Sequence, residues 1–136
     1  MGRRRQSREI ALQALYIIDT SGTPEKEAFA IVNRREDPGD EKVLEFAHAL
    51  VSGAHSLRRN LDHDIEKTAE NWSVKRMAAV DRNILRLAAY ELIYRHDTPI
   101  NVIIDEAIEI ARKFSTEDST RFINGILDKL KEKRPA

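Results

Sequence analysis

The sequence predicts an all-α fold of about seven helices in one domain that spans residues 1–136. Apolar residues recur at spacings of three and four through most of the chain, as at Ile10, Ala14 and Ile17. The five glycines and four prolines fall mostly between these periodic segments. Sustained apolar–polar alternation, the pattern of a half-buried strand, is lacking. A chain of 136 residues is long enough to bury a core of its own.

Three helices are expected in the first third of the chain. The first carries the apolar line that starts at Ile10, begins at Ser7 or nearer Arg4, and stops at "TSG". Thr23 begins the second, a short helix with proline in its first turn. Asp40 is a suitable N-cap for the third.

The remaining helices follow from similar signals. The third helical pattern continues to about residue 72, with a break near Asn60. Asp81 begins the most apolar helix, "RNILRLAAYELIYR", and Pro99 separates it from the next. "STED" caps the last helix, in which we interpret Gly125 as a close helix–helix contact.

Composition excludes several classes of function. Lys and Arg number 23 and so do Asp and Glu, so no net charge attracts a nucleic acid or a membrane surface. There is no cysteine, and no apolar run approaches the roughly 20 residues that cross a bilayer. A cytoplasmic protein is therefore expected.

No catalytic or metal site is expected either. The four histidines lack the spacing and the further ligands of a metal site, and "DEAIE" is typical of a solvated helix face. Phosphate-binding loops and nucleophile elbows are missing. We therefore expect no enzyme activity and no cofactor.

Four arginines at the start of the first helix, Arg3, Arg4, Arg5 and Arg8, need another explanation. Cations at a helix N-terminus cost roughly 0.3–1 kcal/mol each. A polyanion would offset that cost, because each guanidinium can donate two hydrogen bonds to one phosphate. The alternative is a solvated basic tail. A second basic cluster, residues 129–134, closes the chain, and its contact with RNA stays open.

Three long blocks of sequence carry a resemblance to a known family: "RRRQSREIALQALY", "DRNILRLAAYEL" and "NVIIDEAIEIARKF" with the following "FINGILDKL". They resemble the NusB family of bacterial transcription antitermination factors. The match covers the first helix and most of residues 72–130, whereas residues 21–67 match only in helical pattern and length. The resemblance implies seven helices in two small bundles packed across each other.

The resemblance also implies a function. NusB-like proteins bind the boxA element of nascent ribosomal RNA together with NusE, a small-subunit ribosomal protein. With other Nus factors they act on RNA polymerase and suppress termination. The resemblance also allows the chain to form a homodimer when NusE is absent.

Individual residues acquire roles from the same resemblance. Arg3, Arg4, Arg5 and Arg8 match the family's arginine-rich motif and would hold single-stranded RNA, although Gln6 interrupts the run.

Asp118, Ser119 and Phe122 fall at the family's RNA-facing edge. Phe122 would stack on a base, or else belong to the core. Asp81 falls on the NusE-facing surface, where an acid suits a basic partner, and it is also an N-cap candidate.

Two other functions remain as alternatives. One is a helical protein–protein adaptor whose arginines are a solvated tail. The other is a helix-turn-helix DNA-binding protein, although "STEDSTRFINGIL" lacks an outward basic stripe.

Overall fold

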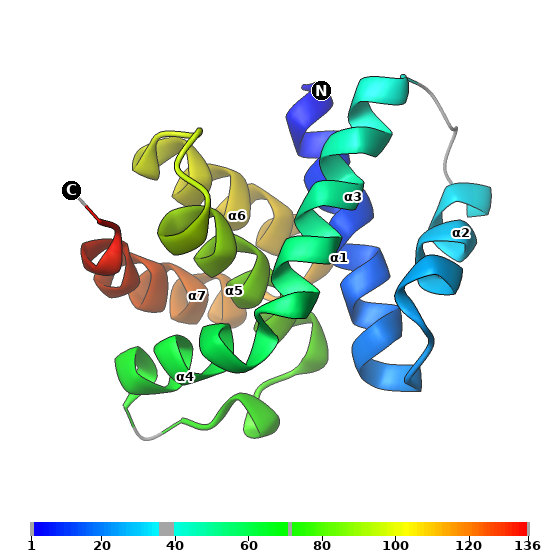
Figure 1. The fold of residues 1–136 in the computed structure, drawn as a ribbon. Helices are drawn as coiled ribbons and strands as arrows, with labels where there is room; N and C mark the ends of the chain where they lie inside the picture. Colours follow the sequence, from blue (N-terminus) through cyan, green and yellow to red (C-terminus); the bar gives the residue numbers. More distant parts are fainter. Residues whose placement is uncertain (1, 36–39, 71, 136) are drawn as a thin grey trace. The chain divides into compact units, whose positions relative to one another are not determined.

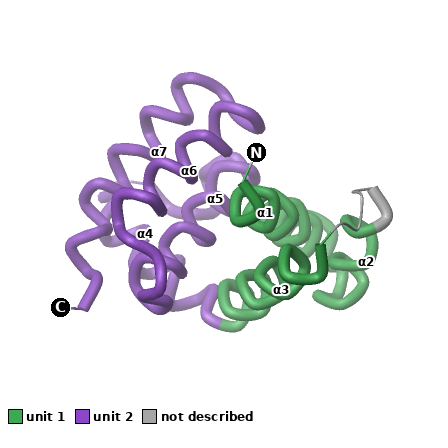
Figure 2. Tube along the Cα trace, turned by 90° about the horizontal axis from the view of Figure 1, so that it is seen from above, with its two compact units in different colours: residues 1–56 green, residues 57–136 purple. Residues whose placement is uncertain are grey.

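Seven α-helices make up most of the computed structural model, which describes residues 2–35, 40–70 and 72–135 (Figure 1). Its contacts divide the chain into two compact units, residues 1–56 and 57–136 (Figure 2). No strand occurs in these described ranges. The prediction of an all-α fold with about seven helices in two bundles is therefore confirmed, and the single domain stays a prediction. None of the helices in the part described is both long and apolar enough to cross a membrane.

Unit 1 is a three-helix unit built around α1 (Arg3–Ser21), which packs against both α2 (Glu25–Arg35) and α3 (Glu41–Ser56). The helical spacing that predicted α1 also sets its buried stripe. The buried side chains of this unit include Ile10, Ala14, Leu15, Ala28, Val32, Val43, Phe46, Leu50 and Val51.

The ends of these helices follow the expected signals with one change. Asp40 caps α3, because its Oδ1 accepts the backbone N–H of Lys42 at 2.9 Å. Gly22 ends α1 in the left-handed region, with φ of 68°. Ser7 is not an N-cap: it lies inside α1, and its buried hydroxyl donates to the carbonyl of Val43 at 2.8 Å. That bond ties α1 to α3.

Unit 2 is arranged around α5 (Ala79–Ala89), which packs against α4 (Arg58–Ala69), α6 (Ile100–Phe114) and α7 (Glu117–Leu130). Short turns join or extend these helices: η1 (Val74–Arg76), the π-helical turn η2 (Tyr90–Tyr94) and η3 (Lys131–Lys133). The buried side chains of this unit include Leu61, Ile65, Ile84, Leu85, Leu92, Ile103, Ile123, Leu127 and Leu130.

The break expected near Asn60 is present, three residues earlier, at Leu57, where the chain leaves helical geometry before α4. Two other local predictions in unit 2 are wrong. Asp81 does not begin α5, since the helix starts two residues earlier with Ala78 as its N-cap. Gly125 makes no close contact, because a Cβ built on it would meet nothing within 4 Å.

The C-terminal basic residues bond largely within unit 2. The Arg134 guanidinium donates to the carbonyls of Leu92 at 2.8 Å, Glu91 at 3.0 Å and Arg95 at 3.2 Å. These carbonyls lie in and just after η2, where the regular helical ladder ends. Arg134, near the C-terminus, therefore caps carbonyls at the end of the continuous α5–η2 helix.

Replacing Arg134 with alanine is expected to lower the free energy of unfolding by about 1.5–3 kcal/mol, because hydrogen bonds from a charged donor are lost. Lys129→Ala, at an exposed position of α7, is the matched control and should stay within about 0.5 kcal/mol of the parent. Urea denaturation measures both. Equal stabilities of the two variants would show that Arg134 does not hold η2.

Candidate nucleic-acid interface

The arginine cluster occupies the first two turns of α1 in unit 1. Arg3 and Arg4 are exposed, Arg5 is half-buried, and Arg8 is only 4% exposed. The first turn of α1 contains no acid, and its N-cap, Gly2, has no side chain that could accept a hydrogen bond. The arginines and the backbone dipole therefore both place positive charge at the start of this helix.

The ring of Phe46 and the carboxylate of Asp40 support this cluster from the α3 side. The Arg4 guanidinium lies 3.7 Å from the centroid of the Phe46 ring, and that of Arg8 lies 5.6 Å from it. Arg3 forms an ion pair with Asp40. The negative face of an aromatic ring attracts a cation, so Phe46 fixes two guanidinium groups that would otherwise repel each other. The arrangement keeps Arg4 exposed while restricting its motion.

The second group of expected site residues lies in the first turns of α7, in unit 2. Thr116 caps this helix, since its hydroxyl accepts the N–H of Ser119 at 3.1 Å, as "STED" predicted. The Asp118 side chain is 89% exposed and pairs with Arg121. Asp118, Ser119 and Phe122 thus lie together at one end of α7, whereas the arginine cluster belongs to the other unit.

The Asp81 carboxylate holds the corner between α6 and α7. Asp81 is only 5% exposed, and its two oxygens accept the hydroxyls of Ser115 at 2.6 Å and Ser119 at 2.7 Å. A buried carboxylate needs such donors to replace its hydration. Its charge therefore faces two serines of its own unit. Sequence reasoning assigned Asp81 to an N-cap or a partner contact and missed this role, because the 34-residue and 38-residue separations leave no local pattern.

Phe122 is half-buried and lies edge-on to Trp72, with the ring centroids 5.7 Å apart and the planes at 67°. Trp72 is 48% exposed, and the guanidinium of Arg76 lies 5.9 Å from its ring. Phe122 is thus neither fully exposed nor a core residue. Sequence reasoning treated Trp72 only as the end of a helix. The available signal was a single tryptophan followed by the basic "VKR".

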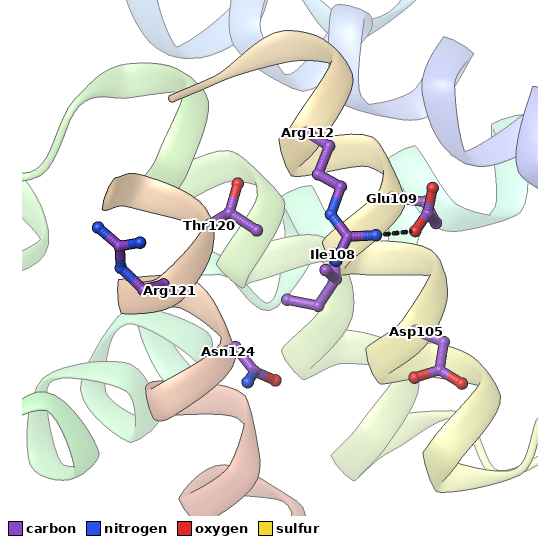
Figure 3. A pocket seen from close by; sticks show the side chains of 7 residues that line it. All are labelled: Asp105, Ile108, Glu109, Arg112, Thr120, Arg121 and Asn124. Carbon is purple, nitrogen blue, oxygen red and sulfur yellow. Dashed lines mark hydrogen bonds and ion pairs between the residues drawn. The ribbon is translucent and has the colours of Figure 1, made fainter. Parts of the chain in front are cut away.

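A polar groove runs between α6 and α7 (Figure 3). The residues that line it are Asp105, Ile108, Glu109, Arg112, Thr120, Arg121 and Asn124. The two arginines of the groove pair with acids of their own helices, Arg112 with Glu109 and Arg121 with Asp118. The described residues include no group of three or more side chains suited to a metal ion. Asp105 and Glu109 of "DEAIE" therefore belong to a charged surface of α6.

Comparison with known proteins decides the family. The family model described as "NusB family" matches residues 5–132. The chain is 47% identical over 135 residues to the transcription antitermination protein NusB of Elusimicrobium minutum, covering 98% of this chain and 96% of the relative. The chain belongs to the NusB family.

Solved structures of NusB proteins have the same fold. T. maritima NusB superimposes with a TM-score of 0.88 at 35% identity, over 100% of this chain and 94% of the other. A crystal structure of the antitermination factors NusB and NusE in complex with dsRNA gives a TM-score of 0.89 at 28% identity, covering 96% of both chains. The fold that the sequence resemblance implied for this NusB-family chain is thus confirmed.

Removal of the Asp81 carboxylate is expected to destabilise this NusB-family chain. Asp81→Ala should lower the free energy of unfolding by about 1.5–3 kcal/mol, because two hydroxyls lose a charged acceptor. Asp81→Asn should cost less, since the amide oxygen still accepts one of them. Asp118→Ala, at an exposed acid in the first turn of α7, is the control and should change stability by about 0.5 kcal/mol or less.

Urea denaturation of the three variants measures these differences. If Asp81→Ala were as stable as Asp118→Ala, the carboxylate would not hold the α6–α7 corner.

Proposed function

We propose that this chain is a transcription antitermination factor that binds the boxA element of nascent ribosomal RNA together with NusE. In this proposal it joins other Nus factors on RNA polymerase in the cytoplasm and helps the polymerase read through terminators. It acts by binding and catalyses no reaction. Membership of the NusB family supports this function, as does the solved complex of a 28% identical NusB with NusE and dsRNA.

The observation that carries the proposal is the arginine cluster on Phe46. Stability alone favours acids at the start of a helix, yet α1 begins with three arginines and no acid. Phe46 holds the exposed Arg4 guanidinium in place before any ligand arrives. A preorganised cation at an open helix N-terminus is suited to phosphate, because the backbone N–H groups and the guanidinium attract the same anion.

The site residues then divide by role. Arg3, Arg4 and Arg5 contact phosphates, and the buried Arg8 completes the cluster from beneath through Phe46. Phosphate contacts fix the register of the RNA, whereas base contacts provide sequence preference.

The base contacts belong to unit 2 in this proposal. Phe122 stacks on a base. Ser119 and Asp118 lie beside it on α7, where Asp118 accepts from a base edge and Ser119 bonds to the RNA.

NusE is the proposed protein partner, and Asp81 marks the surface that meets it. Since the Asp81 carboxylate is bonded to Ser115 and Ser119, its influence on NusE would pass through the α6–α7 corner that it shapes. Calorimetry with NusE on folded Asp81→Ala, which loses both hydroxyl bonds, tests this influence, and Asp81→Asn, which keeps one acceptor, is the milder comparison. An unchanged affinity would remove Asp81 from the interface. A homodimer of the free chain remains part of the proposal.

A helical adaptor without direct RNA binding is the second candidate. Filter binding of the chain to single-stranded boxA RNA, duplex RNA and duplex DNA of equal length separates the functions. The proposed antitermination function predicts that, of the three nucleic acids, the single-stranded boxA RNA binds most tightly. No binding to any nucleic acid would favour the adaptor, and tightest binding to duplex DNA would favour a DNA-binding protein.

The salt dependence of RNA affinity tests the arginine cluster. Each phosphate contact on a single strand contributes about −0.7 to the slope of log affinity against log salt. The double variant Arg4→Ala, Arg5→Ala should make that slope shallower by roughly 1.4. It should also lower the affinity for all RNA sequences by nearly the same factor. Fold stability should change little, because two cations leave a positive helix end.

The matched control replaces Arg58 and Arg59, two adjacent exposed arginines at the start of α4. This variant loses the same charge but should keep the parental slope. Equal slopes in both double variants and the parent would assign Arg4 and Arg5 to a solvated tail.

A further inference from the structure

We propose that Trp72 is a second base-stacking side chain of this chain, which forms one RNA-binding platform with Phe122 and Arg76. The inference rests on the proposed RNA-binding function and extends it to a segment between α4 and η1 that no resemblance singled out. The ligand is single-stranded RNA, in which unpaired bases can stack on aromatic rings.

The exposure of Trp72 is the first observation. It keeps 48% of its surface open, although a side chain of this size gains more from burial than most. Exposed aromatic surface beside a candidate site is typical of a contact surface. Trp72 therefore has a face available for a flat ligand.

The geometry of the aromatic pair is the second observation. Trp72 and Phe122 meet at 67° with their centroids 5.7 Å apart, which is an edge-to-face contact. This contact and the Arg76 guanidinium over Trp72 together cover at most two of the four ring faces. Two successive bases could then stack on different rings, as bases do on proteins that bind single strands.

Positive charge beside the pair is the third observation. The Arg76 guanidinium lies 5.9 Å from the Trp72 ring, and both Arg76 and Lys75 are exposed. An aromatic face for a base with a cation for its phosphate is the usual combination at single-stranded nucleic-acid sites. The positive charge of Arg76 and Lys75 therefore favours a nucleic-acid ligand over a protein partner at this aromatic pair.

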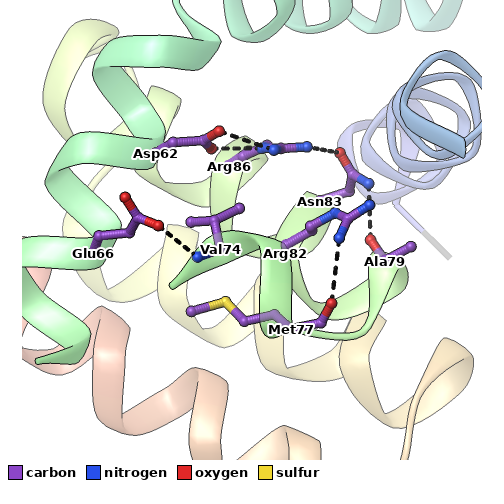
Figure 4. Close-up of polar contacts among 8 residues, drawn as sticks. All are labelled: Asp62, Glu66, Val74, Met77, Ala79, Arg82, Asn83 and Arg86. Carbon is purple, nitrogen blue, oxygen red and sulfur yellow. Dashed lines mark hydrogen bonds and ion pairs between the residues drawn. The ribbon is translucent and has the colours of Figure 1, made fainter. Parts of the chain in front are cut away.

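The residues that follow Trp72 in the chain are bonded to both α4 and α5 (Figure 4). The N–H of the buried Val74 donates to Glu66 of α4 at 2.7 Å. The carbonyl of the buried Met77 accepts from Arg82 of α5 at 3.4 Å. Rigid attachment lowers the entropy that binding must overcome.

The two helices that anchor this segment are themselves joined by a bidentate ion pair. Arg86 of α5 donates to the two carboxylate oxygens of Asp62 of α4 at 2.7 Å and 2.9 Å (Figure 4). A fork-shaped pair of this kind fixes the relative direction of its partners. The residues that follow Trp72 are thus bonded to two helices of unit 2 that are themselves joined.

Intrinsic fluorescence tests the proposal on the unmodified protein. The chain contains one tryptophan, so its emission reports Trp72 alone. Titration with single-stranded boxA RNA should quench the emission and protect the ring from acrylamide. The quenching should follow the binding curve measured independently by anisotropy of labelled RNA.

Variants provide the affinity arm of the test. Trp72→Ala should weaken RNA binding by about fivefold to 150-fold, the affinity equivalent of one base–aromatic stack. Trp72→Phe keeps an aromatic face and should retain most of the affinity. Tyr94→Ala is the control, because Tyr94 is an exposed aromatic of the same unit that bonds to Asp64 instead. It should bind RNA like the parent.

The outcomes separate this inference from the proposed function. RNA binding by the parent without any change in Trp72 emission, or with equal affinity of Trp72→Ala, would overturn the inference and leave the proposed function standing. Absence of RNA binding by the parent would overturn both. Quenching by NusE alone, with RNA affinity unaffected in Trp72→Ala, would assign the platform to the protein partner and contradict the inference.

Discussion

The buried carboxylate of Asp81 is the constraint on which the candidate site of unit 2 depends. By accepting the hydroxyls of Ser115 and Ser119, it joins α5 to the residues at which α6 ends and α7 begins. Asp118 and Phe122 lie in the first turns of α7, so their positions follow from this junction. A buried charge that is fully hydrogen-bonded tolerates few alternative arrangements, because any of them would leave it without donors.

Unit 1 holds its candidate residues by a different interaction. Phe46 of α3 attracts the guanidinium groups of Arg4 and Arg8, and Asp40 attracts that of Arg3. These contacts keep positive charge at a helix end where the backbone dipole opposes it. Unit 1 thus offers cations suited to phosphates, and unit 2 separately offers aromatic rings suited to bases.

The sequence predicted what depends on local patterns and missed what depends on distant pairs. Helical periodicity gave the all-α class, and local capping signals placed Asp40 and Thr116 correctly. Asp81 was assigned to a cap because an acid before an apolar run is typical of one, whereas its partners lie 34 and 38 residues away. Gly125 was assigned to a helix contact, yet a Cβ built on it would meet no neighbouring element within 4 Å. Trp72 and Phe122 contact each other although fifty residues separate them in the sequence. Helical periodicity and capping signals act over a few residues and cannot predict such a contact.

The proposed function requires this NusB-family chain to recognise single-stranded boxA RNA together with NusE. Fluorescence anisotropy with labelled boxA RNA and a scrambled strand of equal length, with and without NusE at fixed salt, measures it most directly. The account predicts tighter binding to boxA than to the scrambled strand, and a larger preference when NusE is present. Equal affinities for both strands in both conditions would contradict it.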